Sequence, residues 1–453
     1  MLERKAYDKL LKWKRERRGA TALLVEGARR VGKTTLVREF ASNEYRSSIF
    51  IDFFTAPNAV KSYFEDYRDD VSSLLFYLSA YYDVDLYERE SLIVFDEVQC
   101  FPSARGLVKY LVADGRYDYV ETGSLLSIRR NVEGIVIPSE EERVALDPLD
   151  FEEFLWAMGE GGIARLLRAH YEALKEPPAD LHRKAMRLWR EYLLVGGMPK
   201  PVDVYRQGRD FELADAEKRA IIDLYRSDVA RFARGYESKV AAVFDEIPGQ
   251  LAKHEKKFTL SSISKDARMR AYEESFYWLS DARVANVCYR ADDPSVGLAM
   301  SKERASLKCY MADTGLLVTH AFSDSGAVDA RTYRSLLVDD IGVNEGMLVE
   351  NAVAQTLRAK GDRLFFYSQS GLDEGEERME VDFLVARPFK DAALKPRVCP
   401  VEVKSPRQYG TTSLDRFKAK FGKRVGTEYV LHPKPLHVEG NRIYLPLYMA
   451  HLV

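Results

Sequence analysis

The stretch "ATALLVEGARRVGKTTLVREF", Ala20 to Phe40, combines an apolar strand, a glycine-bounded loop and a helix. Its loop, from Gly27 to Thr34, has the spacing G-x-x-x-x-G-K-T of a P-loop. Glycines let the backbone turn so that its N–H groups face phosphate oxygens, and the following helix presents the positive end of its dipole to the same anion. A chance loop match is the alternative, and it is weak because strand and helix both lie where a P-loop needs them.

We expect the loop to bind the phosphates of ATP. Lys33 is expected to reach the β- and γ-phosphates and so to take part in catalysis, and the Thr34 hydroxyl is expected to coordinate Mg²⁺. The nucleotide contacts expected from the loop are Gly27, Ala28, Arg29, Arg30, Val31, Gly32, Lys33, Thr34 and Thr35.

A second segment, "SLIVFDEVQ", is an apolar run that ends in Asp96 and Glu97. Such a run is typical of a strand buried on both faces of a parallel sheet, and ligands bind at the carboxyl ends of these strands. Asp96 is therefore expected to hold Mg²⁺ through water, and Glu97 to polarise the attacking water. In "YDYVETGSLLS", Thr122 or Ser124 could sense the γ-phosphate, and a simple strand-to-turn transition is the alternative.

Composition limits the class of protein but not its partner. The chain of 453 residues has 68 Lys and Arg against 70 Asp and Glu, so its total charge favours no class of partner. The four cysteines lie far apart, which argues against a zinc site or a disulfide framework and fits a reducing compartment. A charged N-terminus and the lack of any run of about 18 apolar residues predict a cytoplasmic protein without a signal peptide or a membrane span.

The middle of the chain reads as mainly helical. Asp150, with Glu153 three residues later, predicts a capping box at a helix start. "TLSSIS", a helix near Arg268–Ser280 and the strand "RVANVCYRA" follow the order of a winged helix. The apolar stripe of that helix is expected to be core, whereas a DNA-reading face would need Lys265, Arg268 and Arg270. A wider basic surface expected to bind DNA consists of Lys253, Lys256, Lys257, Lys265, Arg268 and Arg270.

Near the C-terminus, "RMEVDFLVARP" and "CPVEVKS" alternate apolar and charged residues. Neighbouring strands would bring Asp382 together with Glu402 and Lys404, beside Glu350 on the helix "NEGMLVENAVAQTLRAKG". Two carboxylates can hold a divalent metal, and a lysine can orient or activate water, so these residues are candidate catalytic groups and Glu350, Asp382 and Glu402 candidate metal ligands. A solvated strand edge is the alternative.

Together these motifs resemble a bacterial and archaeal family of AAA-type ATPases with a C-terminal DUF4143 domain. The resemblance rests on "GARRVGKTTL", "LIVFDEVQ", "TGSLLS", "DPLDFEEFL", "YLLVGGMPKPV", "KCYMADTGLL", "NEGMLVENAVAQTL" and "EVDFLV" with "VEVKS". It implies an α/β fold with a parallel-sheet P-loop ATPase domain, a winged-helix middle region and a C-terminal α/β domain similar to PD-(D/E)xK (restriction-endonuclease-like) nucleases. The expected regions are 1–160 (ATPase), 161–235 (helical connector or lid), 236–325 (winged helix) and 326–453 (nuclease-like).

Three functions fit these features. The first is an ATPase that uses ATP and Mg²⁺ to couple nucleotide state to DNA engagement; the second is a nucleotide-gated switch that binds a protein partner. The third is an ATP-regulated DNA nuclease with a second divalent metal, Mg²⁺ or Mn²⁺, in the C-terminal domain. AAA-like modules often act as rings, so a homo-oligomer is a further candidate partner. Arg129, Arg130 and Arg143 are candidates for an arginine finger, and none falls on a motif.

Overall fold

The computed structural model describes residues 2–124, 139–253, 255–295, 297–322, 345–370, 378–387 and 397–453. The chain forms two compact units. The N-terminal unit consists of Met1–Asp147 together with Asp281–Arg283, and the C-terminal unit of Pro148–Ser280 and Val284–Val453.

The N-terminal unit is built on a five-stranded sheet in the order β2-β3-β4-β1-β5, and all its strands are parallel. The sheet's strands are β1 (Ala22–Gly27), β2 (Ser47–Asp52), β3 (Ser91–Asp96), β4 (Asp118–Gly123) and β5 (Glu141–Leu146). The helices are α1 (Lys5–Arg17), α2 (Lys33–Glu44), α3 (Asn58–Asp66), α4 (Val71–Tyr82) and α5 (Pro102–Asp114). This is the expected parallel-sheet P-loop fold.

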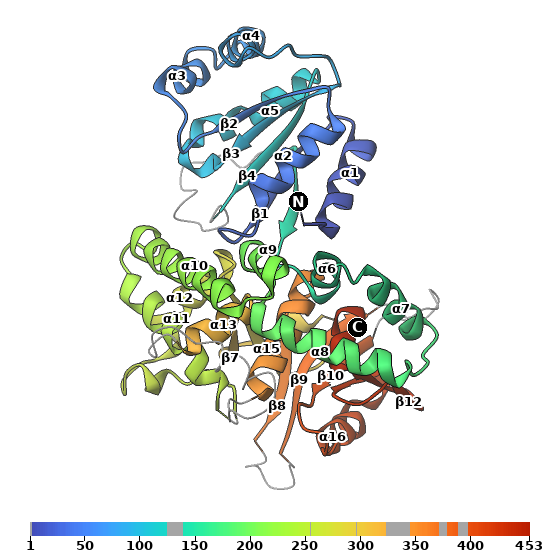
Figure 1. Ribbon diagram of the computed structural model, residues 1–453. Coiled ribbons are helices and arrows are strands. Elements are labelled where there is room, and N and C mark those ends of the chain that lie inside the picture. Colours follow the sequence, from blue (N-terminus) through green and yellow to red (C-terminus); the bar gives the residue numbers. More distant parts are fainter. Residues whose placement is uncertain are drawn as a thin grey trace. The chain divides into compact units, whose positions relative to one another are not determined.

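Helices cover both faces of this sheet (Figure 1). The side chains of α3, α4 and α5 form one apolar core with the sheet, while α2 packs on the other face. The central strands β3 and β4 are buried along their whole length, which explains the continuous apolar run in the sequence. Because the strands are parallel, the P-loop after β1, Asp96 at the end of β3 and Ser124 after β4 come together at one edge of the sheet.

The C-terminal unit begins with a series of helices. Their bounds are α6 (Phe151–Ala157), α7 (Gly161–Glu172), α8 (Ala179–Val195), α9 (Pro199–Gly208), α10 (Phe211–Phe232), α11 (Glu237–Leu251), α12 (Met269–Asp281), α13 (Thr314–Ala321), α15 (Glu345–Ala359) and α16 (Thr412–Phe421). The predicted capping box at α6 is confirmed: Asp150 accepts a hydrogen bond from the Glu153 amide at 2.9 Å, and Glu153 accepts one from the Asp150 amide at 3.1 Å.

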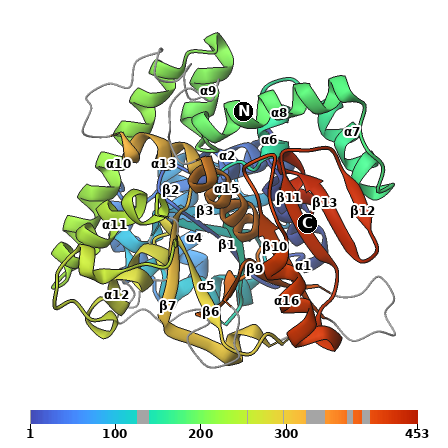
Figure 2. The same ribbon diagram turned by 90° about the horizontal axis from the view of Figure 1, so that it is seen from below.

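A single eight-stranded sheet, in the order β12-β13-β11-β10-β9-β8-β6-β7, spans the unit. Its strands are β6 (Ala285–Ala291), β7 (Lys302–Met311), β8 (Phe365–Gln369), β9 (Met379–Arg387), β10 (Arg397–Val403), β11 (Glu428–His432), β12 (His437–Glu439) and β13 (Arg442–Pro446). Figure 2 shows β6 and β7, in yellow, continuing into the orange and red strands. The strand expected as part of a winged helix is β6, and it pairs with β7 and β8 in this sheet. The winged helix and the four-part division of the chain stay predictions.

Two glycine-containing motifs meet in a buried polar network of this unit. Gly196 has a φ of 82°, and a Cβ atom there would lie 2.2 Å from the Asp313 carboxylate. Asp313 also accepts a hydrogen bond from the Gly197 amide at 2.6 Å. Beside it, the Thr314 amide and hydroxyl both donate to the side chain of Gln355 on α15, at 2.9 Å each. The segments "VGGMP" and "ADTGL" therefore serve the core of the fold.

None of the helices in the described ranges combines the length and the apolar character that a membrane crossing requires.

Candidate functional site

The P-loop joins the carboxyl end of β1 to the start of α2, and geometry requires glycine at both of its ends. A Cβ atom on Gly27 would lie 2.3 Å from the carbonyl oxygen of Leu146. Gly32 has a φ of 96°, in the left-handed region that glycine adopts without strain. The backbone between them can therefore turn sharply enough to present its N–H groups to a phosphate.

Lys33 is the first residue of α2, and its side chain is buried at this edge of the sheet. Its ammonium donates hydrogen bonds to the carbonyl oxygens of Gly27 at 3.1 Å and Ala28 at 3.0 Å, and to the Ser124 hydroxyl at 3.0 Å. The structure thus places Ser124, a candidate phosphate sensor, in direct contact with the P-loop lysine.

The charge of Lys33 depends on its surroundings. Burial lowers the pKa of Lys33 to about 8, although the carboxylates of Glu97 and Asp96 act in the opposite direction. Arg29 and Arg283 lower this pKa further. Phosphate oxygens beside the ammonium would favour its charged form and raise the pKa again. Nucleotide binding and protonation of Lys33 are therefore coupled.

Asp96 is the centre of the second half of the site. The Thr34 hydroxyl lies 3.0 Å from each of its carboxylate oxygens, and the Thr122 hydroxyl donates a further hydrogen bond to it. Thr122 in turn accepts a hydrogen bond from the Glu97 amide at 3.4 Å. The Glu97 carboxylate is oriented by the side-chain amide of Gln99. Thr122 therefore fixes both acidic residues, a contact that its position in the sequence left open.

This set of groups fits Mg²⁺ bound with a nucleotide. Hydroxyl and carboxylate oxygens, completed by water and phosphate oxygens, are the ligands that Mg²⁺ takes in nucleotide sites. Thr34 and Asp96 lie together and present such oxygens next to Lys33. They would hold the ion, and the ion would neutralise charge on the β- and γ-phosphates.

Two arginines that belong to no recognisable sequence motif contact the P-loop or the residue before it. Arg4 donates to the carbonyl oxygen of Val31 at 3.2 Å. Arg283 pairs with Glu26, the residue before the P-loop, at 2.6 Å, and with Asp147 at 3.3 Å. Both come from segments remote in sequence, which is why the sequence pattern alone could not assign them.

Only one of the candidate arginine fingers can be placed. Arg143 on β5 donates to Glu141 at 2.9 Å and is 43% exposed. Arg129 and Arg130 lie outside the described residues.

Residues 20–155 match a protein-family model described as an AAA domain, and residues 345–449 match the domain of unknown function DUF4143. The chain carries an AAA domain and a DUF4143 domain. This combination confirms the resemblance drawn from the motifs, while the likeness of the DUF4143 domain to PD-(D/E)xK nucleases stays a prediction. A further domain of unknown function, DUF8612, matches residues 186–326. None of the curated proteins matches the sequence.

Several solved structures are similar at low identity. The Aeropyrum pernix ORC1 protein in complex with DNA is 13% identical, with 72% of this chain and 93% of that chain covered and a TM-score of 0.27. AMPPCP-bound DnaA from Aquifex aeolicus is 13% identical over 62% of this chain and 80% of that chain, with a TM-score of 0.27. Drosophila ORC bound to DNA is 14% identical over 72% and 96%, with a TM-score of 0.24. Likeness at this level carries no conclusion about ligands of the AAA domain.

In the DUF4143 domain, the stretch "CPVEVKS" contains the second half of β10, which is the fourth of the eight strands of the sheet. β9 and β10 are antiparallel, with Phe383 opposite Val401. Asp382 accepts a hydrogen bond from the Val403 amide at 2.8 Å, and Lys404 donates to Glu402 at 2.6 Å. The structure thus brings Asp382, Glu402 and Lys404 together.

The expected alternation along β9 is interrupted by one extra residue. Leu384 lies opposite Phe365 of β8, but Val381 lies opposite Tyr367, so four residues of β9 lie along three of β8. Phe383 was expected on the same face as Val381. Its ring instead packs against Tyr310, with ring centroids 5.6 Å apart, on the side where Tyr310 donates to Glu350 at 2.5 Å.

A lysine that the sequence did not single out lies among the acidic groups. Lys308, on β7, is almost fully buried. Its ammonium lies 2.7 Å from Glu380, 3.2 Å from Glu350 and 3.6 Å from Asp382. Lys256 also pairs with Glu350. Lys256 is therefore engaged in this cluster of the C-terminal unit and does not join the basic surface expected for DNA.

The carboxyl groups of this cluster differ in their protonation. Burial, together with the neighbouring acids, raises the pKa of Asp382 to about 6 and that of Glu402 to about 8. Burial also opposes ionisation of Glu350, but Lys308 and Lys256 outweigh it and lower the pKa to about 2. Glu350 is the carboxylate that the two lysines stabilise most.

These groups do not fit the expected second metal. Within the described ranges no cluster of three or more His, Cys, Asp or Glu side chains is arranged to hold a metal ion. Lys308 is the group that Glu350, Glu380 and Asp382 share. A metal at Glu350, Asp382 and Glu402 thus stays a prediction that this arrangement does not support.

Proposed function

We propose that the protein is an Mg²⁺-dependent ATPase whose nucleotide state controls its engagement of DNA. The observation that carries the ATPase part is the joint placement of Lys33, Thr34 and Asp96 at the carboxyl edge of a parallel sheet. This is the arrangement that phosphoryl transfer needs, because catalysis of that reaction consists largely of positioning and electrostatic stabilisation.

Lys33, Glu97 and Ser124 have different roles in the proposed reaction. Lys33 exchanges its bonds to the Gly27 and Ala28 carbonyls for bonds to phosphate oxygens. Glu97, held by Gln99, orients and polarises the attacking water. Ser124 follows the position of the Lys33 ammonium and so is placed to report whether the γ-phosphate is present.

Nucleotide binding and turnover test this part separately. Lys33→Ala should abolish ATP binding measured by titration calorimetry, because the variant loses the phosphate-binding cation. Lys109→Ala, at an exposed lysine of α5, is the matched control and should bind like the wild type. Undiminished ATP affinity in Lys33→Ala would refute the proposed site. Turnover of the isolated chain is expected to be slow, since an arginine finger adds roughly 10³ to 10⁵ in rate.

The DNA part rests on a basic surface of the C-terminal unit. Its exposed cations are Lys253, Lys257, Lys265, Arg268 and Arg270. No acidic side chain within the described ranges forms an ion pair with them, so their charge is available to a phosphate backbone. We expect binding without sequence preference, because cations on a surface recognise phosphates rather than bases.

Salt dependence tests this surface. Each phosphate contact contributes a slope of about −0.9 to log K against log salt on duplex DNA. A gel-shift titration at two salt concentrations should therefore show affinity that falls steeply with salt. Arg268→Glu with Arg270→Glu is the test variant of the surface. The control is Lys175→Glu with Lys200→Glu, which makes the same change of net charge at exposed lysines of the same unit outside the basic surface. Binding that ignores salt, or no binding at low salt, would contradict the DNA role.

A nucleotide-gated switch with a protein partner is the second candidate, favoured by exposed aromatic residues on α4. Phe76 is 68% exposed and Tyr81 44% exposed, and Tyr77 stacks on Tyr67 with ring centroids 4.6 Å apart. Exposed aromatic groups of this kind are enriched in protein interfaces. Under this alternative, Phe76→Ser with Tyr81→Ser would abolish binding of the protein partner and leave ATP binding intact.

Assembly into a ring belongs to the same proposal, because a second copy would supply an arginine finger. Sedimentation with and without ATP tests it, with Glu97→Gln used to keep the nucleotide intact. A monomer under both conditions would exclude an arginine supplied by a neighbouring copy.

A further inference from the structure

The carboxylates expected to form a nuclease site already have a cation between them. Lys308 approaches Glu380, Glu350 and Asp382 at 2.7, 3.2 and 3.6 Å. It reaches them from β7, at one edge of the sheet, while the acids come from α15 and β9. Three separate segments of the fold therefore converge on one ammonium group.

We propose that the Lys308 ammonium takes the place of a divalent cation in this cluster, and that the DUF4143 domain of this chain does not act as a metal-dependent nuclease.

The charges of the cluster are nearly balanced without a metal. Four carboxyl groups, those of Glu350, Glu380, Asp382 and Glu402, face the ammonium groups of Lys256, Lys308 and Lys404. Because its pKa is raised to about 8, Glu402 is largely uncharged at pH 7. A buried charge is tolerated when it is paired, and here nearly every charge is. A divalent cation bound by the same carboxylates would add two positive charges next to Lys308. Neighbouring like charges repel strongly in a buried site.

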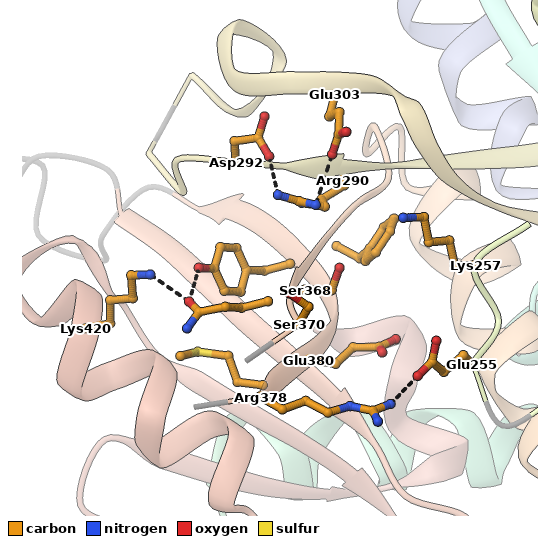
Figure 3. A pocket seen from close by; sticks show the side chains of 14 residues that line it. Glu255, Lys257, Arg290, Asp292, Glu303, Ser368, Ser370, Arg378, Glu380 and Lys420 are labelled. Atoms are coloured by element: carbon orange, nitrogen blue, oxygen red, sulfur yellow. Dashed lines mark hydrogen bonds and ion pairs between the residues drawn. The ribbon is translucent and has the colours of Figure 1, made fainter. Parts of the chain in front are cut away.

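Access to the cluster is also poor for a phosphodiester. Glu402 is buried, and so is Glu350; only Glu380 extends into an open pocket of about 800 Å³. Figure 3 shows this pocket with Glu380 on its wall. Asp382 is less exposed than Glu380, at 16% against 35%, so a nucleic acid strand would meet the cluster mainly at Glu380.

The charges of the pocket compensate one another. Figure 3 shows Arg290 between Asp292 and Glu303, at 2.8 and 3.1 Å, and Arg378 paired with Glu255. Arginines whose charge is taken up by carboxylates offer little attraction to a phosphate backbone. The arginines of the pocket thus add little positive field beside the cluster, and the pocket's other cations are Lys257 and Lys420.

Binding of Mn²⁺ to the full-length, nucleotide-free protein tests the proposal. The electron paramagnetic resonance signal of free Mn²⁺ measures how much of the ion the protein binds. The wild type and Asp382→Asn should bind the same amount, because Asp382 takes part in no metal site. Lys308→Met should create a site for one Mn²⁺, and Asp382→Asn in that background should remove it. Lys218→Met is the matched control: Lys218 is also buried, donates to the Leu194 carbonyl at 2.7 Å and contacts none of the cluster, so this variant should gain no metal.

Two results would overturn the proposal. One is a wild-type site for Mn²⁺ that Asp382→Asn abolishes. The other is a folded Lys308→Met protein, shown by its circular dichroism, that binds no Mn²⁺. If Lys308→Met does not fold, nicking of supercoiled plasmid by the wild type with Mg²⁺ or Mn²⁺ decides the question. Nicking that disappears in Asp382→Asn refutes the proposal. Nicking that is equal in both proteins is background and supports the proposal.

Discussion

Nucleotide affinity should fall as pH rises above 8, because the P-loop lysine is buried before it meets its ligand. Burial lowers the pKa of Lys33 to about 8 in the free protein. Only the ammonium form attracts phosphate, and bound phosphate keeps that form charged by raising its pKa. The affinity is therefore nearly complete below about pH 7 and is lost progressively as the pH rises through 8.

The size of the effect follows from this pKa. The charged fraction of Lys33 drops from roughly nine tenths at pH 7 to roughly one tenth at pH 9. If the bound lysine stays charged, the dissociation constant rises about tenfold over these two pH units, equivalent to about 1.4 kcal/mol. Phosphate groups themselves titrate near pH 6, below this window.

Calorimetric titration with a non-hydrolysable ATP analogue and constant Mg²⁺, from pH 6.5 to 9.5, measures this effect. Lys33→Arg is the control, since a guanidinium stays charged throughout this range and its affinity should be flat. Lys33→Met should bind weakly at every pH. A wild-type curve without slope would refute the reasoning, and an equal slope in Lys33→Arg would assign the titration to another group.

Three further predictions concern single positions. Glu97→Gln should bind ATP normally and lose turnover by about 10² to 10⁴, as expected when a catalytic base is removed; normal turnover would exclude the role of Glu97. Gly27→Ala should lower the free energy of unfolding by about 1–3 kcal/mol through its backbone clash, whereas Gly106→Ala, in open space on α5, should raise it by about 0.5–1 kcal/mol in the same denaturant titration. Arg268→Glu with Arg270→Glu should weaken DNA binding and reduce the salt slope by about 2, and an unchanged slope would move the DNA contact elsewhere.

The nucleotide site was predictable because its parts are local in sequence. The loop spacing from Gly27 to Thr34 and the apolar run before Asp96 each describe one strand and its end. A parallel sheet brings such ends together by its topology alone, so correct local patterns were enough. The capping box at Asp150 was predictable for the same reason.

The C-terminal cluster was predictable only in part. Alternation along β9 and β10 predicted that Asp382 and Glu402 would meet, but no local pattern connects them with Lys308, about 70 residues earlier by the printed numbering. α15 shows the same limit. Val349, Val353 and Leu357 recur along it at helical spacing, a pattern that predicts a single buried face, whereas the helix is buried on all sides from Met347 to Leu357 and its polar residues bond to α13.

The order of strands in the large sheet sets a limit on how the molecule can be dissected. The DUF4143 match begins at residue 345, yet β8 depends on β6, which ends at Ala291, for one of its two hydrogen-bonded edges. A recombinant fragment cut at that boundary would expose a strand edge carrying Phe365 and Phe366, and bare edges of this kind invite aggregation. The fragment would also lack Lys308, so the acidic side chains that pair with it would be buried without their cation. Insolubility of such a fragment would reflect where it was cut, and a soluble version should start before β6.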